Sequence, residues 1–282
     1  MNKVGYALKL DTAPLSRRDI LLASLAALTR AQARSRIRLG CQTRAYGSPL
    51  KNRSELLAAL ADLHDLGYEG FETNFASLAD SFADPQSARA EIARRGLPLI
   101  GLHMGAALFS PARLEKEQEQ IAQIARAVKD FGGEYLMLSG NEPRAEPRRK
   151  RLPRAGNQTL FTPPRHELEN DARVLRAILD DTDPRQVSIV LDVGNPFPPD
   201  FTPAKIVRRY AARIPAFHLR DSIAGKEVLS GAGEFDFAEL GRVLAETDWA
   251  GWLIVEVNRN PQIPSRKMTE TARDFVRKQM KR

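Results

Sequence analysis

The stretch Ser188-Ile-Val-Leu-Asp-Val-Gly-Asn195 is an apolar run of strand length that ends on a carboxylate and a glycine. Two later apolar runs carry His218 and Glu256 in the same way. The interval from Asp192 to His218 and the interval from His218 to Glu256 each hold one amphipathic helical pattern, which is the spacing of successive strand–helix units. The sequence therefore predicts that these three residues lie at neighbouring strand ends and face a common centre.

Strand-like and helix-like segments alternate on both sides of this stretch. The strand candidates are residues 37–43, 70–74, 97–104, 134–138, 159–162, 188–195, 216–221 and 251–258, and the helix candidates are 54–66, 87–95, 112–131, 167–179, 202–213, 237–247 and 268–280. This alternation predicts an α/β fold, namely a (β/α)8 TIM barrel. Three prolines and a glycine interrupt the arginine-rich run at 141–158, so we expect the fourth outer helix to be missing or replaced by a basic loop there.

Length, composition and charge narrow the class of protein. The chain has 282 residues, 43% of them hydrophobic, which is enough for one large core. Its formal net charge of +8 is concentrated near the two ends and at 144–154, and no basic stretch is interleaved with aromatic residues. We therefore expect no nucleic-acid partner, while an oligomer stays open. Cys41 is the only cysteine and can form no intrachain disulfide.

Residues 1–33 have the features of a twin-arginine export signal. Lysines precede Arg17-Arg18, a short apolar run follows at 20–28, and small residues at 31 and 33 form a cleavage site after Ala33. The apolar run is about half as long as a membrane-spanning helix, so we expect no permanent anchor. This hypothesis divides the chain into a signal (1–33) and a barrel domain (34–282) in a periplasmic or otherwise exported protein. The alternative is a surface helix capped by Ser16.

Polar residues gather at the predicted strand ends, where barrels of this kind place their active sites. One imidazole among carboxylates suits a divalent ion such as Mn²⁺, Co²⁺, Mg²⁺ or Zn²⁺. We predict Asp192, His218 and Glu256 as metal ligands, and the remaining strand-end groups as substrate contacts: Glu72, His103, Asn195 and Asp221. The structural alternative is that His218 is a hydrogen-bonded core histidine and that Asp192 braces a turn.

Several of these motifs together resemble a known family. The runs Leu191-Asp-Val-Gly-Asn195, Phe217-His-Leu-Arg-Asp221, Gly231-Ala-Gly-Glu-Phe-Asp-Phe237 and Trp249-Ala-Gly-Trp-Leu-Ile-Val-Glu256, with Gly67-Tyr-Glu-Gly-Phe-Glu72 before them, are similar to the successive motifs of the xylose isomerase-like TIM barrels. That superfamily includes sugar-phosphate isomerases/epimerases, ketose 3-epimerases, inosose dehydratases and endonuclease IV.

The resemblance implies a function and roles for individual residues. Asp192, His218 and Glu256 match three of the family's four metal ligands. In the epimerases a further glutamate on the fifth strand is the fourth ligand and the acid/base partner of the last one. The implied chemistry is a metal that polarises a ketose while two carboxylates move a proton across an enediolate, with Glu256 as the catalytic base.

The chain departs from the family's pattern in two places. Residues 160–167 read Leu-Phe-Thr-Pro-Pro-Arg-His-Glu, without the usual strand-end glutamate or His-Asn-His run, so the fourth ligand is missing or displaced to His166 or Glu167. Position 195 is Asn where the family commonly has His. The leading hypothesis is an exported, metal-dependent isomerase, epimerase or related lyase acting on a sugar or cyclitol. The alternatives are a degenerate carbohydrate-binding barrel and an endonuclease IV-like nuclease, for which four histidines are too few.

Overall fold

The protein forms a closed barrel of eight parallel strands. The computed structural model describes residues 37–106, 112–140, 159–162 and 169–280. The strands close in the order β1-β10-β7-β6-β5-β4-β3-β2. They are β1 (Arg38–Gln42), β2 (Gly70–Asn74), β3 (Leu99–Ala106), β4 (Tyr135–Gly140), β5 (Thr159–Thr162), β6 (Val187–Asp192), β7 (Ala216–Leu219) and β10 (Trp252–Val255). The predicted α/β barrel is confirmed.

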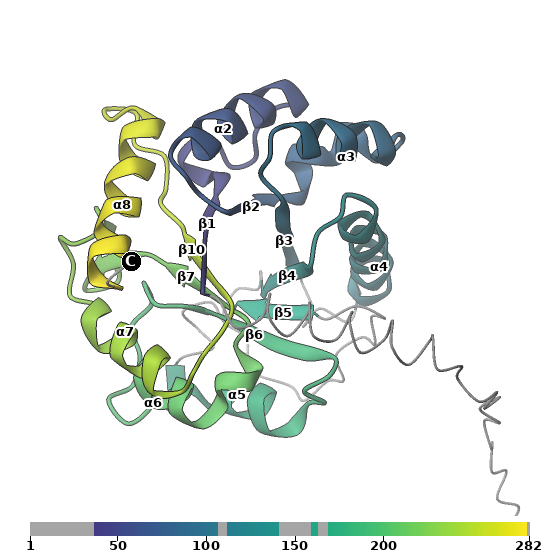
Figure 1. Ribbon diagram of the computed structural model, residues 1–282. Helices are drawn as coiled ribbons and strands as arrows, with labels where there is room; N and C mark the ends of the chain where they lie inside the picture. The colour runs from purple at the N-terminus through teal and green to yellow at the C-terminus, as the bar shows by residue number, and fades with distance from the viewer. Residues whose placement is uncertain (1–36, 107–111, 141–158, 163–168, 281–282) are drawn as a thin grey trace, which may run out of the picture. The chain divides into compact units, whose positions relative to one another are not determined.

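Helices surround the strands on the outside (Figure 1). The described helices are α2 (Arg53–Asp65), α3 (Pro85–Arg94), α4 (Leu114–Asp130), α5 (Glu169–Asp181), α6 (Pro203–Tyr210), α7 (Phe237–Glu246) and α8 (Ser265–Gln279), with 3₁₀ turns η1 (Thr43–Ala45), η2 (Phe75–Ser81) and η4 (Ala211–Arg213). The predicted export signal at 1–33 and the basic loop predicted at 141–158 lie outside the described residues. So do His166 and Glu167. No described helix combines the length and apolar character that crossing a bilayer requires.

Short-range sequence signals set most helix ends. The helix predicted at 202–213 begins with Pro203 in the first turn of α6, and the Thr202 side chain caps it by accepting a hydrogen bond from the Lys205 N–H. The helix predicted at 54–66 begins slightly earlier, at Arg53, because the Asn52 side chain caps it by accepting a hydrogen bond from the Glu55 N–H at 2.9 Å. Gly67 ends α2 with a φ of +76°, a conformation that costs glycine little.

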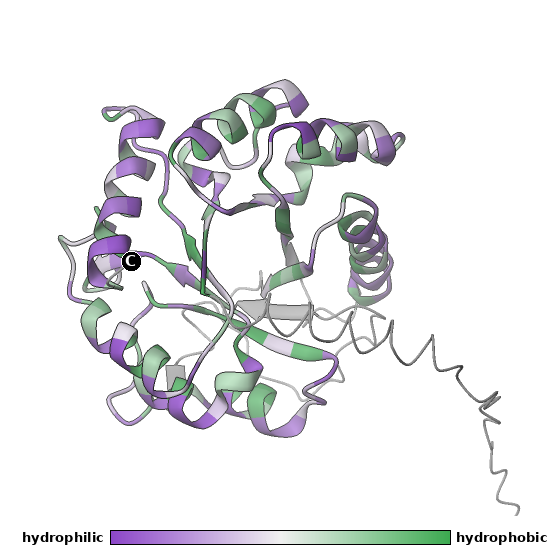
Figure 2. Ribbon diagram, in the orientation of Figure 1, coloured by the Kyte–Doolittle hydropathy of each residue, from purple (hydrophilic) through white to green (hydrophobic). Residues whose placement is uncertain are grey.

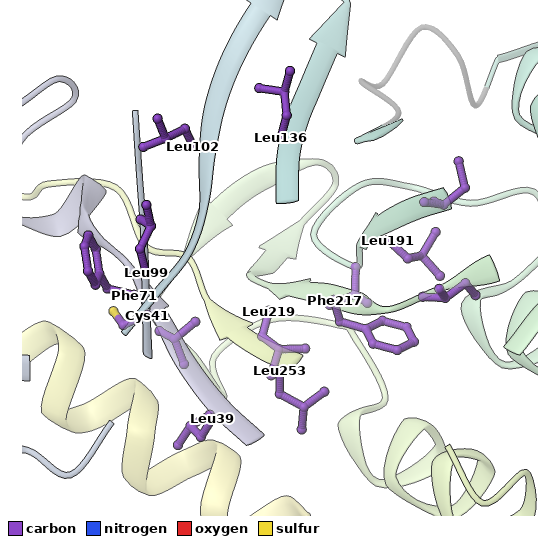
Figure 3. Close-up of a cluster of buried hydrophobic side chains, with 14 of the residues drawn as sticks. Leu39, Cys41, Phe71, Leu99, Leu102, Leu136, Leu191, Phe217, Leu219 and Leu253 are labelled. Carbon is purple, nitrogen blue, oxygen red and sulfur yellow. The ribbon is translucent and has the colours of Figure 1, made fainter. Parts of the chain in front are cut away.

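The larger part of the core lies between the barrel and its helices. Figure 3 shows side chains from several strands in this layer, among them Leu39, Leu191 and Leu253. Phe217 of β7 packs edge-on against Trp249, with ring centroids 5.0 Å apart. The helices turn their apolar sides toward the strands and their hydrophilic sides outward (Figure 2). This layer holds the helices on the barrel.

A second, smaller cluster fills the inside of the barrel. It consists of Ile100, Met137, Val190, Ala216, Trp252 and Ile254, all fully or almost fully buried. Gly40 and Gly70 leave the space that Trp252 and Ile100 occupy, since a Cβ on Gly70 would lie 2.7 Å from the Trp252 ring. The Arg38 guanidinium covers the same ring from 3.8 Å. The barrel interior is thus a packed core and not a channel.

A short antiparallel hairpin follows β7. The strand predicted at 216–221 ends at Leu219, and Asp221 instead begins the hairpin formed by β8 (Asp221–Ile223) and β9 (Lys226–Val228). The backbone leaves the barrel at this point because the Asp221 carboxylate accepts hydrogen bonds from the N–H groups of Gly231 and Gly233, at 2.8 and 3.0 Å. The loop beyond the hairpin is therefore anchored on Asp221.

Candidate functional site

The carboxyl ends of three neighbouring strands bring the predicted ligands together. In the pairing of β6 with β7, Asp192 stands opposite His218. Glu256 directly follows β10, and its N–H donates to the carbonyl of Leu219 at 3.1 Å. Alternate residues of a strand share one face. Asp192, His218 and Glu256 each come two positions after an inner-core residue, Val190, Ala216 or Ile254, and therefore point to the same side of the barrel wall. The rigid inner core therefore supports the site from below.

His218 is buried between two carboxylates, those of Glu72 and Glu256. Its Nε2 is 2.7 Å from Glu72 Oε2, and its Nδ1 is 3.2 Å from Glu256 Oε2. The exposed fractions of Glu72, His218 and Glu256 are 0%, 1% and 4%. Neither His218 Nδ1 nor Glu72 Oε1 has a hydrogen bond of acceptable geometry, although both atoms are shielded from water. Such unsatisfied buried atoms are uncommon in native proteins, so they mark Glu72, His218 and Glu256 as a candidate site.

Two arginines lie beside the Glu256 carboxylate, one at each oxygen. Arg44, from η1 after β1, places Nη1 2.7 Å from Glu256 Oε1. Arg220, directly after β7, places Nε 3.8 Å from Glu256 Oε2. Burial disfavours the Glu256 carboxylate, but His218, Arg220 and Arg44 outweigh burial and hold its pKa well below the ordinary range. Glu256 is therefore ionised at neutral pH.

Arg220 also forms a bidentate ion pair with both carboxylate oxygens of Asp192. Its Nε and Nη2 lie 3.2 and 2.5 Å from Asp192 Oδ1 and Oδ2, the two-pronged geometry that makes arginine–carboxylate pairs strong. The Gly194 N–H donates to Oδ1 at 2.9 Å. Asp192 is thus held by Arg220 and by the backbone of its own turn.

These residues fit a divalent cation only in part. Metal-binding histidines commonly donate one ring N–H to a carboxylate and ligate through the other nitrogen, which matches Glu72 at Nε2 and the unbonded Nδ1 of His218. Two ligands of one ion lie about 3 Å apart, as do Nδ1 and Glu256 Oε2. Within the described ranges, however, no group of three ligating side chains has formed. The donor chemistry fits a cation at His218 and Glu256, and Asp192 can join once Arg220 leaves it.

The other predicted site residues lie near this centre in different ways. His103 of β3 packs edge-on toward His218, with ring centroids 6.4 Å apart, while Asn195 is partly exposed in the loop after β6. Glu72 is fully buried behind His218. Asp221 is 2% exposed and bonds its own loop, where a Cβ on Gly233 would collide with it. Substrate contacts of these four residues remain predictions.

Arg44, Arg220 and Glu227 belong to the site but were not among the predicted residues. Arg220 lies two positions after His218, so the alternation of a strand indicated its side. Glu227, in β9, is 3.4 Å from Arg220 Nη1 and accepts from the N–H and Nδ2 of Asn258 at 2.6 and 2.5 Å. No sequence signal indicated Glu227, because a short hairpin brings it back over the barrel.

Protonation of His218 is the site's expected pH-dependent feature. Burial lowers the pKa of His218, but Glu72 and Glu256 outweigh it and raise this pKa from 6.5 to about 9. Because the folded value exceeds the unfolded one, the stabilisation is complete below pH 6.5 and is lost as pH rises through about 9.

We expect Glu72→Gln to lower the pKa of His218 in metal-free protein, since it removes the neighbouring charge. Titration of the His218 ring by NMR measures this change. The free energy of unfolding, measured with urea, should also differ less between pH 6 and pH 9 in Glu72→Gln than in the unaltered chain. Glu69→Gln, also in the segment around β2, serves as the control. An unchanged His218 pKa in Glu72→Gln would show that the Glu72 charge does not raise the pKa of His218.

Fold and site together define a (β/α)8 barrel whose carboxyl-end mouth holds carboxylates and one imidazole from β2, β6, β7 and the end of β10. Residues 158–279 match the model of a family described as Xylose isomerase-like TIM barrel. The resemblance predicted from the motifs is confirmed over this part of the chain.

Individual relatives agree with that match. An inosose dehydratase of Geobacillus kaustophilus (strain HTA426) is 24% identical over 252 residues, covering 72% of this chain and 80% of the relative. A solved L-ribulose 3-epimerase superposes with a TM-score of 0.69 at 19% identity, covering 87% of this chain and 95% of that one. The IOLI protein with a bound zinc atom gives 0.64 at 13% identity, covering 86% and 98%. At these identities the solved structures establish the fold.

Proposed function

We propose that this protein is an isomerase, epimerase or related lyase that acts on a sugar or cyclitol by moving a proton at a carbon beside a carbonyl or hydroxyl group. A divalent ion held by Asp192, His218 and Glu256 would polarise the substrate's oxygens. The inosose dehydratase and L-ribulose 3-epimerase relatives support this substrate class. The zinc-bound IOLI protein supports the ion.

The observation that carries the proposal is the buried chain from Glu72 through His218 to Glu256. It places an ionised carboxylate beside an imidazole whose Nδ1 has no hydrogen bond, at the barrel end where such folds carry out chemistry. A structural ion pair has no need for an unsatisfied ring nitrogen. Glu256 is accordingly the proposed base, and it accepts the proton from the substrate carbon.

The surrounding residues have proposed roles in binding. Arg44 and Arg220 reach Glu256 from two sides and are 31% and 20% exposed, so their guanidinium groups can donate to substrate hydroxyl or carbonyl oxygens. His103 is the proposed contact on the β3 side. Glu72 holds the His218 ring in place. Asp221, whose carboxylate is bonded to its loop, shapes the rim of the site.

Proton exchange with solvent tests the proposal. Incubation of manganese-loaded protein in D₂O with L-ribulose or an inosose is expected to place deuterium on the carbon beside the carbonyl, or to yield epimer or dehydrated product, as NMR detects. Asp192→Asn should lower ion uptake and exchange at least tenfold, because it removes a ligand charge. Arg208→Gln, at an exposed ion pair with Glu246, should change neither. Exchange that persists fully in Asp192→Asn would contradict the assigned ligand.

A carbohydrate-binding barrel without turnover is the second candidate. It is favoured by the arginine pairs of Asp192 and Glu256, which leave no three-ligand group among the described residues. Saturable binding of the same sugars without any deuterium incorporation, in both metal-loaded and metal-free protein, would select this candidate over the enzyme.

Export through the twin-arginine route is a separate proposal that rests on residues 1–33. When the full chain is expressed in a bacterial host, we expect the cleaved protein in the periplasmic fraction, with Arg34 as its N-terminus. Changing Arg17 and Arg18 together to lysine should retain the protein, uncleaved, in the cytoplasm. Cell fractionation with N-terminal sequencing measures both outcomes. Equal export of the two forms would refute a twin-arginine signal.

A further inference from the structure

We propose that the Arg220 guanidinium is a built-in cation that competes with a divalent ion for Asp192 and Glu256, and so sets the affinity of the site for metal. The inference rests on the proposed function insofar as a divalent ion is the ligand. It adds to that function a residue that controls when all three ligands are available.

The contacts of Arg220 are those of a cation that bridges ligands. Its guanidinium lies 2.5 Å from Asp192 Oδ2, 3.4 Å from Glu227 Oε2 and 3.8 Å from Glu256 Oε2. Asp192 and Glu256 are almost fully buried, at 5% and 4% exposure, so unpaired charges there would be costly. Arginine remains protonated in proteins, so this cation is present at any working pH.

The backbone around Asp192 is shaped to admit the arginine. A Cβ on Gly194 would lie 2.7 Å from Arg220 Cβ, 3.2 Å from Arg220 Nε and 3.3 Å from Asp192 Oδ1, so the missing side chain lets Arg220 pack closely against the turn that carries Asp192. The Gly194 carbonyl accepts from Ser222 Oγ at 2.9 Å, which ties this turn to the hairpin. On the opposite side, Glu227 is held by Asn258 and contacts Arg220.

Ion and guanidinium cannot both use Asp192. Arg220 occupies both carboxylate oxygens, so a metal gains Asp192 as a ligand only when the arginine moves away. His218 Nδ1 and Glu256 Oε2 are already 3.2 Å apart, and Arg220 Nε lies farther away, 3.8 Å from the same carboxylate oxygen. Without Arg220, one imidazole would face the carboxylates of Asp192, Glu227 and Glu256, a strongly attractive environment for a dication. Competition of this kind appears directly as a change in metal affinity.

Calorimetric titration of the sugar-free protein with Mn²⁺ tests the inference. We expect Arg220→Gln to bind Mn²⁺ at least tenfold more tightly than the unaltered chain. Arg208→Gln loses the same charge at the surface and should bind unchanged. Adding Asp192→Asn to Arg220→Gln should abolish the gain.

The outcomes separate this inference from the proposed function. Equal or weaker Mn²⁺ binding by Arg220→Gln, with measurable binding by the unaltered chain, would overturn the competition and leave the proposed enzyme untouched. If neither chain bound Mn²⁺, the inference and the metal-dependent part of the proposed function would both fail. Thermal unfolding gives a second readout, since Mn²⁺ should raise the Tm of Arg220→Gln more than that of the unaltered chain.

Discussion

Replacement of Glu256 by glutamine is expected to lower turnover by about 10²- to 10⁴-fold, the range for loss of a positioned general base. Glutamine keeps the volume of the side chain but cannot accept the proton. It also removes the charge that pairs with Arg44 at 2.7 Å and faces His218 at 3.2 Å. The measurement is the initial rate on whichever sugar exchanges deuterium with solvent.

Two further measurements make the Glu256 result specific. Glu246→Gln removes the same charge from an exposed ion pair on α7 and should leave the rate unchanged. Circular dichroism should show that Glu256→Gln is folded, because glutamine has nearly the same volume and Arg220 keeps its pairs with Asp192 and Glu227. A folded Glu256→Gln protein with a rate within twofold of the unaltered chain would remove Glu256 from the mechanism.

Replacement of Trp252 by alanine is expected to destabilise the protein by about 3–5 kcal/mol, the usual cost of deleting a large aromatic side chain from a core. Trp252 is 1% exposed and is the largest member of the cluster inside the barrel. Gly40 and Gly70 have no side chains that could move into the space it leaves. The free energy of unfolding from urea titration measures the loss.

Trp252→Phe is the matched control for the cavity. It retains an aromatic ring and removes Nε1, which is buried without a hydrogen-bond partner, so its cost should be well below that of alanine. The position of Glu256 should be affected in the alanine variant too, because Trp252 lies on β10, the strand that Glu256 directly follows. A loss below about 1 kcal/mol in Trp252→Ala would show that the inner core does not support the barrel as proposed.

Much of the architecture follows from local sequence signals. The second and fifth strands were predicted at their observed bounds, and the other strands within a few residues, because apolar runs and glycine or proline boundaries report short-range preferences. Asp192, His218 and Glu256 were placed correctly at neighbouring strand ends, since parallel strands with equal spacing align their carboxyl ends. The helix predicted at 54–66 begins at Arg53, because Asn52 and Ser54 are both residue types that can cap a helix and the folded chain uses Asn52.

The contacts within the site needed the folded chain. Glu72 and His218 are 146 positions apart, and their bond exists because barrel closure brings β2 and β7 to the same interior. Asp221 was predicted as a substrate contact from its place at a strand end, and only the structure shows that its carboxylate binds the N–H groups of Gly231 and Gly233. A motif specifies which residue types are present, but not which partner each one meets.

The stretch 188–195 shows the division most clearly. Its apolar run, its terminal Asp192 and its glycine determined by themselves that a buried strand would deliver a carboxylate to the barrel mouth. Only the tertiary structure decided what that carboxylate meets, and it meets the Arg220 guanidinium, which reaches it over Gly194. Strand propensity and burial act over a few neighbouring residues, whereas the pairing of Asp192 depends on how adjacent strands are set in register.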